Sequence, residues 1–230
     1  MSKLAPTDHL RPTASIAPQA LLPGDPGRAL ALAQDLLEGP RMANHARGLW
    51  GYTAPTARGV QLTIQSTGIG GPSVAVVLEE LARLGVRRAI RLGTCHAIDP
   101  GLPPGEMVVA AAAIPPGADG APGGSRVEPD PGLTAALLAA DDSLREVVVA
   151  GTDLYYDPEA ARRTATRLAA GAEVVDLGTA AALAVGSRLG IAIASALVVA
   201  GSSGGERLDD EGIARASLRL GRAASAVVGG

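Results

Sequence analysis

Hydrophobic and polar positions follow regular spacings along most of this chain, and the clearest pattern lies between residues 61 and 92. Residues 61–66 alternate polar and apolar side chains and include β-branched members, which predicts a strand. After a glycine-rich turn, apolar residues recur as on one buried face of a helix: Val74, Val77, Leu78 and Leu81. Gly85 ends this helix, and residues 86–92 form a second apolar strand. A strand, a helix and a strand in this order predict two parallel strands.

The same two periodicities continue in both directions along the chain. Further strands are expected at 20–22, 44–53, 106–114, 144–150, 173–176 and 191–200. Further helices are expected between Asp25 and Gly39 and at 133–140, 158–170, 179–189 and 208–228. Residues 1–19 are polar and rich in proline, which indicates an extended arm, and 115–131 form a long loop. The alternation predicts an α/β fold over residues 1–230, a single domain with a central mixed sheet between two helical layers.

Two glycine turns in this pattern are candidate anion sites. In the segment 67–71, backbone N–H groups before a helix can approach a negative ligand closely, and Arg91 follows where the next strand is expected to end. The segment 23–28 repeats the arrangement, with Asp25 as helix cap and Arg28 in the first turn of the helix. The pattern alone leaves an alternative open, since these glycines also suit tight turns beside solvated arginines.

Composition and motifs argue against several other functions. The net charge of −3 and the pI of about 5.6 provide no basic surface for nucleic acid. Ser73 stands where the motif G-x-G-x-x-G has its last glycine, so a dinucleotide is not expected. A single cysteine, Cys95, and the lack of a signal peptide or membrane-spanning run predict a soluble cytoplasmic protein. The histidines are scattered and predict no metal site: His9, His45 and His96.

Taken together, the turns resemble one family, the nucleoside phosphorylases of the purine nucleoside phosphorylase and uridine phosphorylase superfamily. The resemblance is strongest to the bacterial hexameric purine enzymes. It is carried, in the family's order, by LLPGDPGR (21–28), ARGLWGYT (46–53), STGIGGPS (66–73), RLGTC (91–95), GTDLYYDP (151–158) and VVDLGTAAAL (174–183). The resemblance implies a three-layer α/β/α fold. It also implies phosphorolysis, in which phosphate attacks C1′ of a nucleoside and releases the free base and pentose 1-phosphate.

The resemblance further implies a phosphate site. Its members would be Gly24, Arg28, Arg47, Arg91 and Thr94. A phosphate dianion needs several cationic and N–H donors, and each charge-assisted hydrogen bond is worth about 1.5–3 kcal/mol. Arginines that converge on one point repel each other without an anion, so their joint presence favours a bound anion. No cofactor is implied beyond inorganic phosphate as co-substrate.

The family is oligomeric, usually a hexamer built from dimers, which implies homo-oligomeric sites shared between subunits. By this resemblance His9 and Arg47 come from the neighbouring subunit, and His9 contacts the 5′-hydroxyl of the ribose. Ile69 would lie under the ribose, and Tyr155 would stack on the base. Both residues suit ordinary packing equally. The implied partners are a nucleoside, phosphate and further copies of this chain, with no nucleic acid and no membrane.

Two positions depart from the family's pattern, and both belong to the half of the site that holds the nucleoside. The family's Val-Glu-Met-Glu segment binds ribose hydroxyls through its second glutamate, and this chain has Gly178 there. Purine enzymes carry Ser-Asp or Ser-Asn after the last long strand, and this chain has Ser203 and Gly204. If these gaps limit purine turnover, Gly178→Glu and Gly204→Asp are expected to raise it.

The remaining side chains near these gaps complete the expected site. The expected nucleoside contacts besides His9, Ile69 and Tyr155 are Asp176, Leu177, Gly178 and Ser203. Glu206, two residues beyond Gly204, is the candidate general acid, a role worth about 10²–10⁴-fold in rate. Arg91 and Glu206 are therefore the expected catalytic residues.

Several functions remain open on these residues. A purine nucleoside phosphorylase is favoured, because the segment 151–156 resembles the purine branch and no Gln-x-Arg for uracil is present. The alternatives are a uridine phosphorylase and a phosphate-binding paralogue with weak or no nucleoside turnover. A nucleosidase that uses water is disfavoured, since such enzymes dispense with the phosphate arginines.

Overall fold

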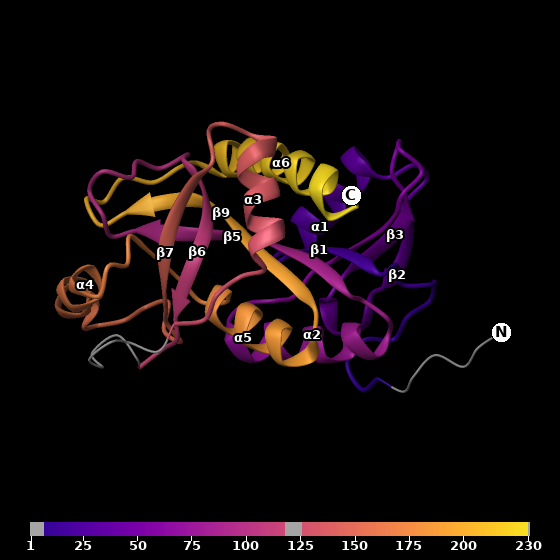
Figure 1. Ribbon diagram of the computed structural model, residues 1–230, viewed down its shortest axis with the longest axis horizontal. Helices are drawn as coiled ribbons and strands as arrows, with labels where there is room; N and C mark the ends of the chain where they lie inside the picture. The colour runs from indigo at the N-terminus through magenta and orange to yellow at the C-terminus, as the bar shows by residue number, and fades with distance from the viewer. Residues whose placement is uncertain (1–6, 118–125, 230) are drawn as a thin grey trace.

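Figure 1 shows the computed structural model of the chain, which describes residues 7–117 and 126–229. In these residues one sheet contains nine strands: β1 (Gln19–Pro23), β2 (Arg41–Asn44), β3 (Gly51–Pro55), β4 (Gln61–Gln65), β5 (Arg88–Ala97), β6 (Met107–Ile114), β7 (Arg145–Gly151), β8 (Val174–Asp176) and β9 (Ala192–Ser202). The α-helices are α1 (Pro26–Leu36), α2 (Gly71–Arg83), α3 (Pro131–Ala140), α4 (Ala160–Ala169), α5 (Thr179–Leu189) and α6 (Asp210–Val228).

Helices cover both faces of the sheet. In Figure 1, α1, α3 and α6 lie above the sheet, and α2 and α5 lie below it. Two hydrophobic clusters correspond to these layers, one containing Val77 of α2 and the other Leu220 of α6. Neighbouring residues of β1 divide between the clusters, Leu22 in the first and Leu21 in the second, as the period of two requires. The three-layer α/β/α architecture expected from the sequence is confirmed.

The order of the strands brings the glycine turns together. The sheet order is β2-β3-β4-β1-β5-β8-β7-β6-β9, and β5 also pairs with β9, so the strands from β5 onward form a closed ring. β4 and β5 are parallel, as predicted, but β1 lies between them and pairs in parallel with both. The C-terminal ends of β1 and β4 are therefore neighbours, and the turns that follow them lie side by side.

β5 is longer than the predicted strand 86–92. It runs on to Ala97 because β9 pairs with it in parallel over its whole length, as far as the pair Ala97 and Ser202. Arg91 and Thr94 consequently lie inside the strand and not at its C-terminal end. Local residue pattern could not show this, since the extension depends on hydrogen bonds to a strand that is distant in sequence.

The single strand predicted at 44–53 is wrong. β2 ends at Asn44, a 3₁₀ turn spans Ala46–Gly48, and β3 begins at Gly51. Arg47 has φ 59° and Gly48 has φ 70°, which is the left-handed region, so the chain reverses here and β2 and β3 pair antiparallel. A non-glycine residue in this region is uncommon, and this one belongs to the expected phosphate site.

The helix predicted at 158–170 also differs in two respects. It begins at Ala160, because Asp157 Oδ1 accepts a hydrogen bond from the Glu159 N–H and closes a turn first. Arg167 on this helix is buried, although a helix with several arginines suggests a solvated face. Its neighbour Arg163 pairs with Asp157 at 3.0 Å. Part of the predicted loop 115–131 lies outside the described residues, and α3 already begins at Pro131.

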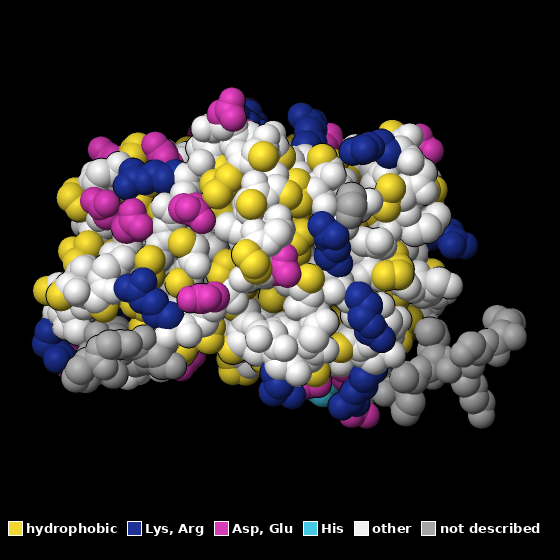
Figure 2. Space-filling view, in the orientation of Figure 1, with side chains coloured by type: hydrophobic (Ala, Val, Ile, Leu, Met, Phe, Trp, Pro, Cys, Tyr) yellow, Lys and Arg dark blue, Asp and Glu magenta, His cyan; other side chains and the backbone are white. Residues whose placement is uncertain are grey.

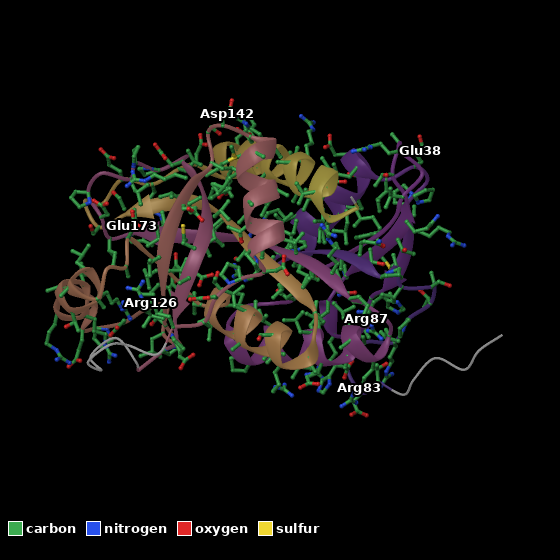
Figure 3. The ribbon with its side chains drawn as sticks, viewed as in Figure 1. Glu38, Arg83, Arg87, Arg126, Asp142 and Glu173 are labelled. Carbon is green, nitrogen blue, oxygen red and sulfur yellow. The ribbon has the colours of Figure 1, made fainter. Side chains whose placement is uncertain are left out.

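Charged side chains of both signs are interspersed on the face shown in Figure 2. Exposed ones such as Glu38, Arg83 and Asp142 project from the ends of elements (Figure 3). Among the described residues, no helix is long and apolar enough to cross a lipid bilayer. The same residues contain no group of three or more His, Cys, Asp or Glu side chains suited to hold a metal ion.

Candidate active site

A cavity of about 530 Å³ opens where the turns after β1 and β4 meet β5. It gathers residues that are far apart in sequence, and most residues of the expected site are among them. We call it the arginine cavity, defined by Gly24, Asp25, Pro26, Arg28, Arg47, Gly48, Leu49, Gly68, Ile69, Gly70, Arg91, Gly93, Thr94, Tyr155 and Leu177.

Backbone hydrogen bonds join the two glycine turns of this cavity. The Gly68 N–H donates to Gly24 O at 3.0 Å, and the Thr67 N–H donates to Pro23 O at 2.9 Å. A Cβ at Gly24 would lie 3.4 Å from Gly68 O, which is an ordinary van der Waals contact. Both turns run directly into helix N-termini, where N–H groups without helical partners favour an anion.

Arg28 lies in the first turn of α1, where Asp25 fixes the start of the helix. Asp25 Oδ1 accepts a hydrogen bond from the Arg28 N–H at 2.7 Å. Burial lowers the pKa of the Arg28 guanidinium, Asp25 partly offsets this, and the positive charge of Arg91 lowers it further. The group remains a cation at neutral pH, because the ordinary arginine pKa lies above about 12. A bound anion would relieve both unfavourable contributions.

Arg47 reaches the cavity from the turn between β2 and β3. This turn is fixed at Leu49, whose carbonyl oxygen accepts hydrogen bonds from the side-chain amides of Asn44 and Gln65. Arg47 is exposed and lines the cavity of its own chain together with Arg28. The resemblance assigned Arg47 to the neighbouring subunit's site, whereas in this structure a single chain already brings it to the cavity.

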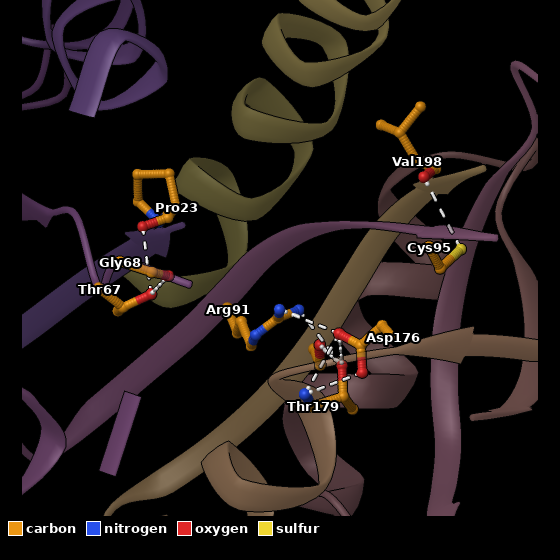
Figure 4. A network of polar contacts seen from close by, with 9 residues as sticks. Pro23, Thr67, Gly68, Arg91, Cys95, Asp176, Thr179 and Val198 are labelled. Atoms are coloured by element: carbon orange, nitrogen blue, oxygen red, sulfur yellow. Dashed lines mark hydrogen bonds and ion pairs between the residues drawn. The ribbon is translucent and has the colours of Figure 1, made fainter. Parts of the chain in front are cut away.

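Arg91 extends from the middle of β5 and is engaged by an acid (Figure 4). Its Nη2 lies 2.9 Å from Asp176 Oδ2, and its Nη1 donates to Thr179 Oγ1 at 3.2 Å. Both partners are buried, and they stand at the end of β8 and the start of α5. The guanidinium therefore borders the cavity while two of its nitrogens are bound to protein acceptors.

A second cavity of about 380 Å³ adjoins the first and shares Thr94, Tyr155 and Leu177 with it. We call it the tyrosine cavity; its other lining residues are Cys95, His96, Thr152, Leu154, Tyr156, Asp157, Ala160, Arg167, Val175, Asp176, Ala200, Gly201 and Arg207. A flat ligand at the shared wall would meet the Tyr155 ring while its other end pointed toward the arginines.

The polar groups of the tyrosine cavity are mostly engaged with each other. Asp157 pairs with Arg163 and Asp176 with Arg91. Arg207 donates to the Tyr155 hydroxyl at 3.3 Å. Burial and, secondarily, the charge of Arg207 lower the pKa of His96, which outweighs the opposing hydrogen bond with the Ser202 backbone. His96 is consequently neutral at pH 7, because its pKa lies below the ordinary value of about 6.5.

A family model described as "Phosphorylase superfamily" matches residues 18–229. The chain belongs to this superfamily. Among curated relatives, the DeoD-type purine nucleoside phosphorylase of Geobacillus kaustophilus is 41% identical over 102 residues, which is 44% of this chain and 43% of that protein. The DeoD-type enzyme of Oceanobacillus iheyensis is 45% identical over 84 residues, 36% of this chain and 35% of that protein. The alignments thus span less than half the length of these relatives.

Solved structures of the same fold cover nearly the whole chain. Uridine phosphorylase from Vibrio fischeri matches with a TM-score of 0.81 at 22% identity, covering 93% of this chain and 92% of that one. Purine nucleoside phosphorylase from Toxoplasma gondii, solved with immucillin-H, matches with a TM-score of 0.82 at 22% identity, covering 93% and 91%. At 22% identity, this structural similarity establishes the fold of the chain and nothing further.

The arginine cavity brings together every residue expected to bind phosphate, together with three expected nucleoside contacts. The phosphate set is Gly24, Arg28, Arg47, Arg91 and Thr94, and the nucleoside contacts are Ile69, Tyr155 and Leu177. Asp176, a further expected nucleoside contact, lines the tyrosine cavity but not the arginine cavity. Tertiary structure thus unites segments that the sequence could only associate through a resemblance.

Other expected residues lie outside both cavities. His9 Nδ1 is 2.8 Å from Glu80 Oε1 on α2, so within this chain His9 helps to attach the N-terminal arm to α2. Ser203 donates its backbone N–H to Ala97 O, and Glu206 is exposed in the following turn. Gly178 is the N-cap of α5 and lies against the Arg91 guanidinium.

Sequence reasoning missed three residues of the site. Arg167 and Arg207 line the tyrosine cavity, and Thr179 holds Arg91. Arg207 directly follows Glu206, the expected general acid, so its place in the sequence could have indicated that it belongs to the site. Arg167 gave none, because an arginine on a helix with two further arginines nearby has the pattern of a solvated face.

Proposed function

We propose that this protein catalyses the phosphorolysis of purine nucleosides to a free base and pentose 1-phosphate. The observation that carries the proposal is the convergence of Arg28, Arg47 and Arg91 with two glycine turns on one cavity, which adjoins a second cavity at Tyr155. This arrangement suits a dianion held beside the sugar of a flat, aromatic ligand. The DeoD-type purine phosphorylases among its relatives support the same class of substrate.

In the proposed reaction, phosphate oxygens accept hydrogen bonds from Arg28, Arg47 and the turn at Gly24. The cationic cavity places the nucleophile against C1′ of the pentose, and this positioning is the main contribution of the cavity to the rate. The C1′–N bond breaks, its electron pair passes to the base, and a proton is taken up by the departing base. No cofactor other than the co-substrate phosphate takes part in this proposal.

The proton donor for the base has to be a group other than the paired carboxylates of the tyrosine cavity. Both carboxylates of the tyrosine cavity are held in ion pairs. We propose Glu206 as general acid, because its backbone oxygen accepts a hydrogen bond from the Ser202 N–H and Arg207 beside it lines the tyrosine cavity.

A second candidate function is favoured by the same paired carboxylates. A protein that binds phosphate but turns over nucleosides weakly would have an intact arginine cavity and a tyrosine cavity without an available acid. Uridine phosphorolysis is the third candidate, and the fold shared with the Vibrio fischeri uridine phosphorylase is compatible with it. Hydrolysis by water is disfavoured, since a nucleosidase has no need of three converging arginines.

We further propose a homo-oligomer, a hexamer built from dimers, located in the cytoplasm. Exposed apolar side chains support an interface, and Ile69 among them lines the arginine cavity: Met42, Trp50, Ile69 and Val76. In such an assembly His9 of one subunit would reach the ribose in the next. Mass measurement by light scattering tests the assembly, and a fully active, monodisperse monomer would refute it.

One assay separates the candidate functions. The protein is incubated with inosine, adenosine, guanosine or uridine, with and without inorganic phosphate, and base release is followed by chromatography. Phosphate-dependent release of a purine supports the proposal, and release from uridine alone supports the pyrimidine alternative. If no base is released but phosphate raises the melting temperature, the protein is a phosphate-binding paralogue. Release without phosphate would indicate a nucleosidase and overturn the proposal.

A further inference from the structure

We infer that Asp176 is a positioning residue for the arginine cavity, and that Gly178 is glycine because the Arg91 guanidinium occupies the space of a side chain there. The inference rests on the proposed function, because it takes the ligand of the arginine cavity to be phosphate. Asp176 then acts through Arg91 and not by contact with the nucleoside, which reassigns the role expected from the sequence.

Arg91 is bound by Asp176 and Thr179, and these two residues are hydrogen-bonded to each other. Its Nη2 lies 2.9 Å from Asp176 Oδ2, and Thr179 Oγ1 accepts from Nη1 at 3.2 Å. The Thr179 N–H donates to Asp176 Oδ1 at 3.0 Å, and the Thr179 hydroxyl donates to Oδ2 at 2.9 Å. Ser195 Oγ lies 3.1 Å from the same hydroxyl. With Asp176 only 1% exposed, this network fixes the plane of the guanidinium (Figure 4).

The network uses only part of the hydrogen-bonding capacity of Arg91, because a guanidinium has five N–H donors and the contacts with Asp176 and Thr179 each use one. Within residues 7–117 and 126–229, the buried Arg91 Nε has no hydrogen-bond partner. The guanidinium therefore keeps N–H donors that its protein neighbours do not use. Arg91 lines the same cavity as Arg28 and Arg47, which supplies the cationic surroundings that a phosphate oxygen needs. Asp176 therefore orients Arg91, and its negative charge reduces the repulsion among the three arginines when no anion is bound.

The geometry at Gly178 explains why this arrangement needs a glycine. A Cβ built there would lie 2.6 Å from Arg91 Nη2, 2.9 Å from Nε and 3.0 Å from Cζ. The φ of Gly178 is −128°, so alanine is not strained by the backbone. The three nearest atoms all belong to the Arg91 guanidinium, which must shift to make room for a side chain at position 178. We expect this shift to disturb the ion pair with Asp176, because the same guanidinium forms that pair.

A double-mutant cycle tests the inference with inorganic phosphate as the probe. Gly178→Ala, Asp176→Asn and the double variant are compared with the unaltered protein by calorimetry. Each single variant is expected to weaken phosphate binding about tenfold, as loss of a charge-assisted hydrogen bond does. The double variant is expected to be no weaker than either single one, because both changes break the same contact.

A matched control variant and kinetic measurements separate a loss of Arg91 positioning from general damage to the fold. Gly132→Ala, on α3, places a Cβ whose nearest atom is Asp130 Oδ1 at 3.3 Å, and it is expected to bind phosphate normally. If the protein turns over nucleosides, the KM for phosphate rises in Gly178→Ala while the KM for the nucleoside does not. Asp176→Glu, which keeps the charge, is expected to recover part of the phosphate affinity.

Two results would overturn the inference. Phosphate bound by Asp176→Asn as tightly as by the unaltered protein would show that Asp176 does not position Arg91, and tighter binding would show that Asp176 competes with the anion. Additive effects of the two changes would show that position 178 acts elsewhere. If the unaltered protein binds no phosphate, the proposed function fails instead. Thermal unfolding without ligand then tests the contact alone, and there Asp176→Asn is expected to raise the melting temperature of Gly178→Ala.

Discussion

The arginine cavity and the tyrosine cavity share a wall but differ in what their charges do. In the first, Arg28 and Arg47 form no ion pair with any carboxylate among the described residues, and they face a common space. In the second, Asp157 and Asp176 are neutralised by Arg163 and Arg91. Charge without a protein partner marks a place for a ligand, whereas a paired charge mainly maintains structure.

The comparison shows how two halves of one site can differ in completeness. Part of the arginine cavity is made from two turns that backbone hydrogen bonds join at Gly24 and Gly68. The tyrosine cavity depends on the turn after β9 and on the helix α4. A phosphate would find its donors in place, but a departing base would find no acid that is free of an ion pair. The following experiments test this difference.

The largest effect is expected from removing a cation from the arginine cavity. Arg28→Met is expected to lower phosphate affinity and phosphate-dependent base release about 100-fold, since a cation that we propose to bind the anion is lost. Steady-state kinetics with varied phosphate measure it. Arg222→Met is the matched control, because Arg222 pairs with Asp35 on the exposed surface of α6. Equal losses in both variants would contradict the assignment.

The next effect separates folding from binding. Glu80 is buried on α2, and its carboxylate accepts hydrogen bonds from the N–H groups of Asp8, His9 and Leu10. Glu80→Gln is expected to lower the free energy of unfolding by about 2 kcal/mol while phosphate still raises the melting temperature. Chemical denaturation measures the first quantity and thermal shift the second. A lost phosphate response would show that the arm contributes to the arginine cavity.

The same carboxylate predicts a dependence of stability on pH. Burial raises the pKa of Glu80, but the hydrogen bonds from Leu10, His9 and Asp8 outweigh this and lower it below the ordinary value. A lowered pKa stabilises the fold above the unfolded value, about 4.3, and this contribution disappears as pH falls through the folded value. The unfolding free energy of Glu80→Gln is therefore expected to change less than that of the unaltered protein on acidification below pH 4.3.

A smaller effect should distinguish the two glycines of the nucleoside half. A Cβ at Gly204 meets only Ser202 Oγ, at 3.6 Å, so Gly204→Asp is accommodated and is expected to raise purine release about tenfold by supplying an acid. Gly178→Glu was expected to act likewise, but its Cβ would displace Arg91, so it is now expected to weaken phosphate binding. Base release at saturating and at limiting phosphate measures both.

The smallest effect is expected at Cys95, which lines the tyrosine cavity but is almost wholly buried. Burial raises the pKa of the Cys95 thiol, Asp176 adds to the rise, and Arg91 opposes it. The thiol stays protonated at pH 8 and is expected to resist iodoacetamide until the protein is unfolded. Mass spectrometry of the native protein measures this. Rapid alkylation would show that the tyrosine cavity opens to solvent more than its lining indicates.

Sequence patterns predicted the elements well where the local signal was strong. The start of α1 at Asp25 and the end of α5 at Gly190 follow from capping chemistry that involves only near neighbours. The strand at 44–53 failed because the left-handed turn at Arg47 is held by side chains of Asn44 and Gln65. Nothing in the alternation of residues 44–53 signals contacts with β4.

The sequence by itself determined the layers of the fold, because periodicity and capping are properties of short segments. It also supplied the phosphate-site candidates, through short motifs that resemble those of a known family. Only the tertiary structure decided the partners of these residues. β5 extends because β9 lies beside it, and Arg91 binds Asp176 because β8 and α5 are packed against its strand. The physical reason is that an ion pair or a ladder of hydrogen bonds depends on distances in space, which separation along the chain does not fix.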